Sequence, residues 1–329
     1  MTLELFSTKL LNAAIVAVFF GLIIWLLRFL YGPKGKLRDP EWDRWNEEAR
    51  IKLEAELDEA ADKALAERFE DYARRWFTGD DGHDRHLRLK MDHTARVLAH
   101  AREIAALEKD FSPEGHGRDA SRALTLAALF HDVGRFEQYT RYKTFADPLS
   151  CNHGSLGASI LRKEAFLKYE SPEIRRLAIL AVALHNRYAV PERLSGKSRA
   201  VLEALRDADK LDILRVMAEH LGPEDPGPEH PGQTPKRDSV VLLHLADEPA
   251  RVSPAILDAL KEGRSARYAD MRYYNDFRLL LCTWLDELRY ETSLAIAKRQ
   301  GHMDLLINGL CGAPEAQALA RARVDAAFG

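Results

Sequence analysis

The chain is poor in cysteine, and its opposite charges nearly balance. It has three cysteines in 329 residues, at positions 151, 282 and 311. An odd number at wide spacing indicates neither a disulfide framework nor a zinc knuckle, so we expect a reducing compartment. The formal net charge is −3, which argues against a nucleic-acid partner, because proteins dedicated to nucleic acids are usually basic. A hydrophobic fraction of 46% argues against a disordered chain.

The sequence also lacks runs of alternating apolar and polar residues, and it has no internal repeat. Helical signals are frequent instead. Ser171-Pro172-Glu173 combines a cap, a first-turn proline and an acidic first turn, and Gly134 follows the apolar segment 124–130 as a helix end would require. We therefore predict an all-α fold, a helical bundle.

Charged residues are absent from one long segment, Leu10 to Leu27. With its flanks, a helix of this length can cross a hydrocarbon core of about 30 Å. A cleaved signal peptide would need a more basic start than MTLELFSTK and a small-residue cleavage site, and a buried core helix would rarely be apolar on all faces. We therefore predict a single-pass transmembrane anchor over residues 1–31.

The basic residues beside this segment predict its orientation. Lys9 precedes the segment, whereas four basic residues follow it: Arg28, Lys34, Lys36 and Arg38. Positive flanks stay on the cytoplasmic side of a membrane. We expect the anchor to lie in the cytoplasmic (inner) membrane, with the C-terminal domain in the cytoplasm.

The rest of the chain is expected to have four parts. Residues 32–63 are rich in helix-forming residues and predict a juxtamembrane stalk; a homodimer through this stalk stays open, because clean heptads are not sustained. Residues 64–220 are expected to form the helical core. Five prolines between positions 222 and 239 predict a loop over 221–239, and residues 240–329 are expected to form helices that pack on the core.

Histidine and aspartate recur on the apolar stripes of the predicted helices. His93 shares a helix face with Leu89 and Val97, because residues three and four apart lie on the same side. Asp209 continues the stripe of Leu202 and Leu205, whereas Asp207 points elsewhere. Three more histidines lie on such stripes, and an aspartate follows the first of them directly: His131, Asp132, His153 and His185.

Taken singly, each of these residues is more often a hydrogen-bonded core residue than a metal ligand. Burying ionisable groups from five helices without partners would be very costly. A shared cation removes this cost, because imidazole and carboxylate groups both coordinate it. We therefore expect one or two divalent metal ions per chain, with Mn, Fe, Ni or Mg as candidates.

The order of these residues resembles that of the HD-domain metal-dependent phosphohydrolases. The segment LFHDVGR is close to the hallmark of that family, DADKLD is similar to its closing aspartate motif, and the resemblance covers residues 64–215. It implies a first metal held by four residues: His93, His131, Asp132 and Asp209. His153 and His185 resemble the extra ligands of the binuclear branch, and HGSLGASIL is similar to the segment that carries its third histidine. The alternative is that both histidines bind substrate phosphate in a one-metal site.

The resemblance also implies a hydrolase in which a metal-activated water attacks a phosphate ester, here expected to be a nucleotide. Arg135 resembles the basic residue that follows the His-Asp pair, and a guanidinium suits phosphate. Two substrates are disfavoured. The segment ALHNRYAVP lacks the HHExxDGxGYP-like motif of the cyclic-di-GMP phosphodiesterases, and residues 133–136 do not fit the HDxxED motif of the alarmone hydrolases.

Other polar residues near the His-Asp pair are weaker candidates. Glu137 and Gln138 are expected to bind substrate, with Arg141 and Lys143 as further candidates, and the alternative for all four is an ordinary solvated loop. Lys210, beside Asp209, is expected either to reach phosphate in a catalytic role or to lie at the surface. The rival function is a catalytically silent HD module that binds a nucleotide and signals through the stalk. Monoesterase and diesterase chemistry both stay open.

Overall fold

The computed structural model describes residues 22, 23, 25, 29, 40–224 and 234–329. Apart from four residues, the predicted anchor lies outside this part of the chain, as does the start of the predicted stalk. No helix among the described residues is both long enough and apolar enough to cross a membrane. The chain divides into two compact units, Met1–Leu65 and Ala66–Gly329. The long helix α2 (Pro40–Arg74) runs without a break through the boundary expected at residues 63 and 64.

The described residues confirm the all-helical prediction. They contain no β-strand, and one isolated bridge pairs Ala246 with Tyr273. The helices of the first part of the second unit are α3 (Asp81–Leu107), α4 (Gly117–Phe130), α5 (Gly134–Tyr142), α6 (His153–Lys163), α7 (Pro172–Leu184) and α8 (Gly196–Leu221). Those of the last part are α9 (Pro254–Lys261), α10 (Tyr274–Thr283), α11 (Glu291–Gln300), α12 (His302–Asn308) and α13 (Pro314–Phe328). Short 3-10 helices are η1 (Lys109–Phe111), η2 (Asp147–Leu149), η3 (Tyr268–Asp270) and η4 (Leu285–Glu287).

Local capping explains where several helices begin. The predicted cap at Ser171 is confirmed, because its hydroxyl accepts a hydrogen bond from the Ile174 amide at 3.2 Å. Asn152 caps α6 in the same way, at 2.8 Å from the Ser155 amide. These caps fix the starts of α6 and α7, the two helices that carry His153 and His185.

Gly134 corrects one expectation. It does not end the preceding helix, since α4 stops at Phe130 and Gly134 is the first residue of α5. A Cβ atom at position 134 would overlap the carbonyl oxygen of His153. Glycine is needed here because the start of α5 touches the start of α6, and this close approach brings the His-Asp pair beside His153.

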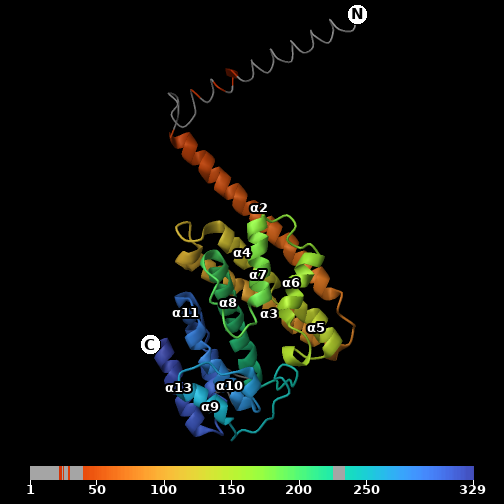
Figure 1. Cartoon of the computed structure of the whole chain (residues 1–329), viewed down its shortest axis with the longest axis vertical. Coiled ribbons are helices and arrows are strands. Elements are labelled where there is room, and N and C mark those ends of the chain that lie inside the picture. Colours follow the sequence, from red (N-terminus) through yellow and green to blue (C-terminus); the bar gives the residue numbers. More distant parts are fainter. Residues whose placement is uncertain (1–21, 24, 26–28, 30–39, 225–233) are drawn as a thin grey trace, which may run out of the picture. The chain divides into compact units, whose positions relative to one another are not determined.

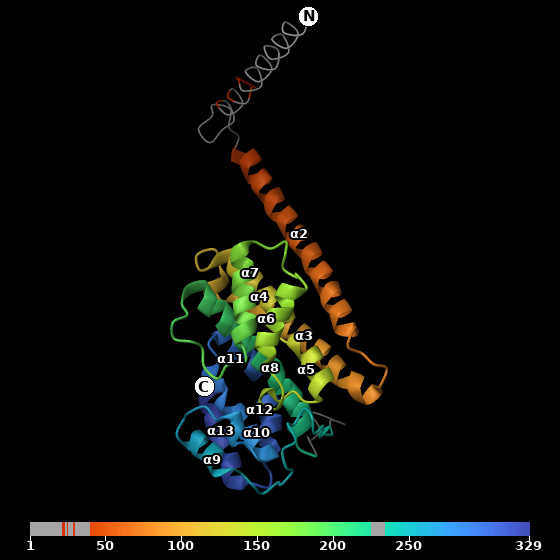
Figure 2. The ribbon, with the colours of Figure 1, turned by 45° about the vertical axis from the view of Figure 1, so that its right-hand side comes forward.

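The helices α3, α4, α7 and α8 form the main bundle of the second unit. Helix α4 packs against the other three, α6 lies on α7, and α5 contacts both α6 and α3 (Figures 1 and 2). Leu124 of α4, Leu177 of α7 and Leu202 of α8 are buried in its interior. The bundle therefore gathers the ends and middles of five helices around one point.

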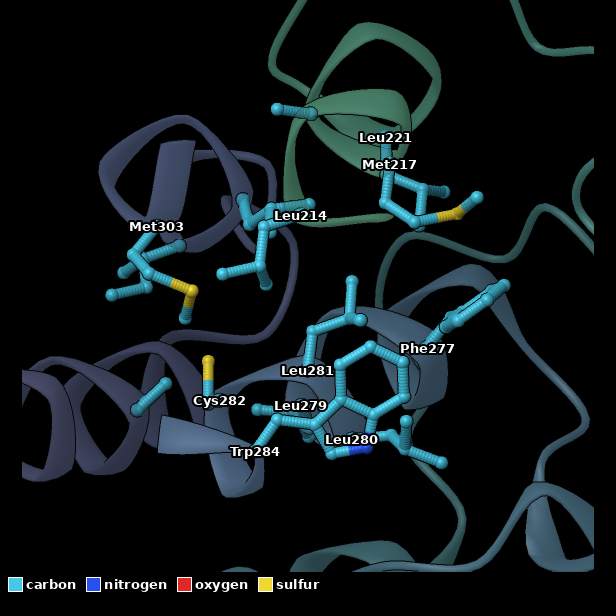
Figure 3. Close-up of a cluster of buried hydrophobic side chains, with 14 of the residues drawn as sticks. Leu214, Met217, Leu221, Phe277, Leu279, Leu280, Leu281, Cys282, Trp284 and Met303 are labelled. Carbon is cyan, nitrogen blue, oxygen red and sulfur yellow. The ribbon is translucent and has the colours of Figure 1, made fainter. Parts of the chain in front are cut away.

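The last part of the chain builds a second, apolar interior. The C-terminal half of α8 packs there with α10 and α12, while α9 and α13 pack on α10. Figure 3 shows Leu214 and Met217 of α8 facing Phe277 and Leu281 of α10, with Met303 of α12 beside them. Helix α8 thus belongs to both interiors.

Candidate metal centre

Three helices bring the first four predicted ligands together. His93 lies in the middle of α3, His131 and Asp132 directly follow α4, and Asp209 lies in the middle of α8. The Nε2 atom of His93 is 3.2 Å from Nε2 of His131 and 3.1 Å from Oδ1 of Asp209. Oδ2 of Asp132 lies 3.7 Å from both histidine Nε2 atoms. The side chains of all four residues therefore converge.

His153 and His185 form a second pair on the other side of Asp132. Their Nε2 atoms are 3.0 Å apart. Oδ1 of Asp132 lies 3.5 Å from Nε2 of His153 and 3.9 Å from Nε2 of His185. One oxygen of Asp132 thus faces each pair of histidines, as a carboxylate shared by two cations would.

Backbone carbonyls determine the tautomer of two of the histidines. Nδ1 of His131 is 2.8 Å from the carbonyl oxygen of Ala128, and Nδ1 of His185 is 2.8 Å from that of Val182. A carbonyl oxygen can only accept a hydrogen bond, so each Nδ1 carries the proton. Each Nε2 atom is therefore left with a free lone pair that points into the cluster.

Carboxylates play the same part for the other two histidines. Nδ1 of His93 is 2.7 Å from Oδ2 of Asp212, and Nδ1 of His153 is 2.8 Å from the carboxylate of Asp147. Such a carboxylate orients a histidine and makes its other nitrogen a better metal ligand. Four Nε2 atoms thus face one another in two close pairs, an arrangement that a cation stabilises by accepting both lone pairs.

The protonation states also suit metal binding. Burial lowers the pKa of His131, and it lowers the pKa values of His153 and His185 to about 4, so these rings are neutral near pH 7. Burial raises the pKa of Asp132, but the positive charges of Lys90 and Arg135 outweigh it, and the net pKa lies well below the ordinary value. Metal ligands must be neutral imidazole and ionised carboxylate, which are the forms favoured here.

His93 differs from the other histidines. Burial lowers its pKa, but the hydrogen bonds with Asp209 and Asp212 outweigh burial and raise the pKa overall. The same contacts leave Asp209 with a lowered pKa in spite of its burial. The carboxylates of Asp209 and Asp212 therefore favour a positive charge at His93.

Two sets of three residues in the described part of the chain have ligand atoms that all lie within 4.8 Å of one another. They are His93, His131 and Asp132, and Asp132, His153 and His185. Asp209 joins the first set through its contact with His93. Nitrogen and carboxylate donors of this kind suit Mn, Fe, Ni or Zn better than Ca. Asp132 belongs to both sets, and each set could hold a divalent cation.

Three residues that support this cluster were not predicted as functional. Asp212 lies three residues after Asp209 on the same stripe, so helical spacing contained a signal for it. Lys90 lies one turn before His93, and its Nζ is 2.8 Å from Oδ2 of Asp132. Asp147 belongs to η2 in the loop between α5 and α6, where no helical period could have revealed it.

Arg135 lies at the cluster, as predicted from its position after the His-Asp pair. Its Nε is 3.3 Å from Oδ1 of Asp132. Its Nη1 donates to the carbonyl oxygen of Phe145 at 2.6 Å and to Oδ1 of Asp147 at 3.2 Å. The guanidinium is therefore held rigidly beside Asp132.

Glu137 and Gln138 have other partners than those expected for substrate-binding residues. Gln138 is fully buried, and its amide donates to Asp147 at 2.8 Å and to the carbonyl oxygen of Cys151 at 2.9 Å. It fastens the loop that carries Asp147. Glu137 pairs with Arg141 at 2.6 Å. The weaker candidate Lys143 lies 3.0 Å from Nδ1 of His83, away from the metal ligands.

The prediction for Lys210 needs the clearest correction. It is buried, its Nζ pairs with Glu287, and the ammonium lies 5.6 Å from the centre of the Trp284 ring. Consecutive residues of a helix point about 100° apart, so Lys210 leaves the face of Asp209. The lysine joins α8 to the C-terminal part of the chain and does not lie among the metal ligands.

The two neighbouring aspartates of α8 separate as the helix-face argument predicts. Asp209 lies in the cluster, whereas Oδ2 of Asp207 accepts hydrogen bonds from the amides of Arg289 and Tyr290, at 2.8 and 3.1 Å. Burial raises the pKa of Asp207 to about 6. Asp207 therefore fixes the start of α11 and takes no part in the cluster.

Comparison with known proteins identifies the segment that contains this cluster. Residues 91–251 match the family model described as HD domain. The match includes all six predicted ligands and extends beyond the proline-rich loop. The curated proteins and the solved structures give no match.

Proposed function

We propose that this chain, which contains an HD domain, is a metal-dependent phosphohydrolase. Its substrate is a phosphate ester, in particular a nucleotide. One observation carries the proposal: four histidine Nε2 atoms and two ionised carboxylates converge, and the two oxygens of Asp132 face different histidine pairs. A divalent cation, when bound by these residues, supplies Lewis acidity and a water of lowered pKa.

The residues around the cluster supply the remaining parts of such a site. Asp212 and Asp147 orient His93 and His153. Arg135 is held by Phe145 and Asp147, so its guanidinium is a preorganised donor for charge that develops on a phosphate. Lys90 adds a second positive group next to Asp132.

We infer that His153 and His185 bind a second cation. Their Nδ1 atoms both have acceptor partners, and their Nε2 atoms meet 3.0 Å apart beside Asp132. In the alternative, both rings contact substrate phosphate next to a single cation.

Metal analysis distinguishes the second cation from the phosphate contact. The unmutated protein is expected to hold about two ions per chain under saturating Mn²⁺, and the double variant His153→Ala with His185→Ala about one. One ion in both proteins would contradict a second metal.

The catalytically silent HD module remains the rival function. The intact ligand set, with three acceptor-bound histidines neutral near pH 7, favours the enzyme. The test is a panel of phosphate monoesters and diesters, including nucleotides, with the full chain purified in detergent. Mn²⁺, Mg²⁺, Fe²⁺ and Ni²⁺ are compared as cofactors. Tight nucleotide binding without turnover under every metal would support the silent module.

We further propose that residues 1–31 anchor this domain to the cytoplasmic membrane, with Gly329 in the cytoplasm. The support is the uncharged segment 10–27 and the excess of basic residues after it. A reporter fused after Gly329 is expected to behave as cytoplasmic, and the protein is expected to resist alkaline carbonate extraction. Periplasmic activity of the reporter would overturn this orientation.

A further inference from the structure

The chain turns back directly after α7, at a candidate metal ligand. Helix α7 ends at Leu184, and His185 follows it as the first residue of a turn, 185–188. The His185 amide donates to the carbonyl oxygen of Ala181 at 2.9 Å, and the Arg187 amide donates to that of Leu184 at 3.0 Å. Residues 185–188 have left the helix, so their own carbonyl groups need partners elsewhere in the structure.

One arginine of α8 binds three of the four carbonyl groups in this turn. Nη1 of Arg206 donates to the carbonyl oxygens of His185, at 2.9 Å, and of Arg187. Its Nη2 donates to that of Tyr188 at 3.3 Å. A planar guanidinium presents its donors in a fixed fork, so these contacts hold the turn in one arrangement. The backbone at His185 is thereby fastened to α8, the helix that carries Asp209.

Both histidines of the second pair depend on this turn. The ring of His185 is oriented through its own backbone, because its Nδ1 donates to a carbonyl oxygen in the last turn of α7. The ring of His153 is oriented by the carboxylate of Asp147, and the turn donates to the same carboxylate through Nδ2 of Asn186 at 2.8 Å. A shift of the turn would therefore move one ring directly and loosen the carboxylate that orients the other.

A cavity beside Arg206 gives the turn room to change when the arginine is removed. Its volume is about 290 Å³, and Arg206, Tyr188 and Glu287 are among the residues that line it. A cavity of this size with polar walls can hold water, which can bind the carbonyl groups that lose the arginine. A substitution at position 206 is therefore expected to free the turn without unfolding the helices around it.

We propose that Arg206 is a positioning residue for the second cation, because it fixes the turn 185–188 and through that turn sets the directions of His185 and His153. This inference rests on the proposed function, specifically on its second cation. Groups that orient metal ligands change metal affinity about 10–100-fold when they are removed. The charge of the arginine acts in the opposite sense, since removing a positive group near a cation strengthens cation binding. Weaker binding therefore reports lost geometry and not lost charge.

The test measures metal affinity in the absence of substrate. Mn²⁺ is titrated into the metal-free full chain in detergent, and its binding steps are followed by calorimetry. Arg206→Met replaces the guanidinium with an apolar side chain that has no donor. We expect this variant to weaken the step of the second cation about tenfold or more and to change the other step less than about twofold.

A combined variant shows which step belongs to the second cation. A protein with His153→Ala and His185→Ala has lost the second site and keeps the first. Adding Arg206→Met to this protein should change its remaining Mn²⁺ affinity less than about twofold, because the arginine no longer has a ligand to position.

Two further variants separate geometry from charge and from stability. Arg206→Lys keeps the positive charge but cannot span three carbonyl groups, so it should weaken the second step as Arg206→Met does, and it replaces that variant if the methionine protein folds poorly. Arg68→Met is the matched control. Arg68 donates to the carbonyl oxygens of Phe166 and Glu164, at 3.1 and 3.3 Å, after the end of α6 that is opposite to His153. Both metal steps should stay within about twofold in this control.

The outcomes distinguish this inference from the proposed function. A second step that is selectively weakened by Arg206→Met and by Arg206→Lys supports the positioning role, even if no ester in the hydrolysis panel turns over. Two steps that Arg206→Met leaves unchanged, weakens equally or tightens would overturn the role of Arg206, while the second cation stands. An Arg206→Lys protein that binds like the unmutated one would overturn it as well. A single ion per chain in the unmutated protein would overturn the second cation and this inference together.

Discussion

Helix α8 passes through two interiors of opposite character. Its middle presents Asp209 and Asp212 to a cluster of buried histidines, whereas its last turns place Leu214, Met217 and Leu221 in an apolar core with α10 and α12 (Figure 3). Burying charged and polar groups is costly unless each has a partner, whereas burying leucine and methionine is favourable. The first interior is therefore suited to chemistry and the second to stability.

This difference predicts which property fails when each interior is changed. Substitutions in the polar cluster should remove metal and activity, and they should lower the free energy of unfolding only where they leave a buried charge without a partner. Substitutions in the apolar core should lower the free energy of unfolding and leave the ligand set intact.

Asp132→Ala should have the largest effect. It removes the carboxylate that faces both histidine pairs and leaves Lys90 and Arg135 without their shared partner. We expect hydrolysis to fall by roughly a thousandfold or more, together with the metal content, measured by steady-state kinetics and elemental analysis. The control is Asp81→Ala, which changes a 92% exposed carboxylate. An Asp132→Ala protein that keeps its full metal content would contradict the assignment.

Leu281→Ala tests the opposite interior. Leu281 is fully buried in the apolar core, and truncating such a leucine costs about 2–5 kcal/mol of unfolding free energy. Urea unfolding should show this loss, while metal content per folded chain and the KM for substrate should stay unchanged. Loss of metal from protein that is still folded would show that the two interiors are not separate.

Asp207→Ala changes an aspartate that belongs to neither interior. Its carboxylate accepts two backbone amides at the start of α11, and removing it leaves buried donors unpaired, at a cost of about 1–3 kcal/mol. We expect lower stability with unchanged metal content, so this aspartate is not silent although it lies outside the cluster. Asp207→Asn keeps an acceptor oxygen and should lose less. Reduced metal content in the folded alanine variant would contradict the helix-face argument.

The smallest effect concerns pH. Burial, with a further contribution from Lys236, lowers the pKa of His220 to about 4 from an ordinary value of 6.5. The unfolded chain therefore binds a proton before the folded one does, and stability is lost as pH falls from about 6.5 to 4. His220→Asn keeps an acceptor for the Asp238 amide but does not titrate. Between pH 7 and 4.5 it should lose about 1–2 kcal/mol less than the unmutated protein in urea unfolding. Parallel curves for the two proteins would rule out this contribution.

Much of the candidate metal cluster could be predicted because its residues lie on regular helices. A period of 3.6 residues shows which side chains share a face, and this was enough to select His93, His153, His185 and Asp209 and to separate Asp209 from Asp207. It also predicted the all-helical fold and the cap at Ser171. These inferences need only the local geometry of one helix at a time.

Other parts of the site were decided by contacts between distant segments. Asp147 reaches His153 from a short 3-10 helix, and the ammonium of Lys210 pairs with Glu287 from the C-terminal part of the chain. A helical period tells which way a side chain points, but not what another segment places in front of it. Loops have no such period, so their partners depend on how the whole chain packs. By itself, the sequence determined which residues could bind metal, and only the tertiary structure decided which groups orient them.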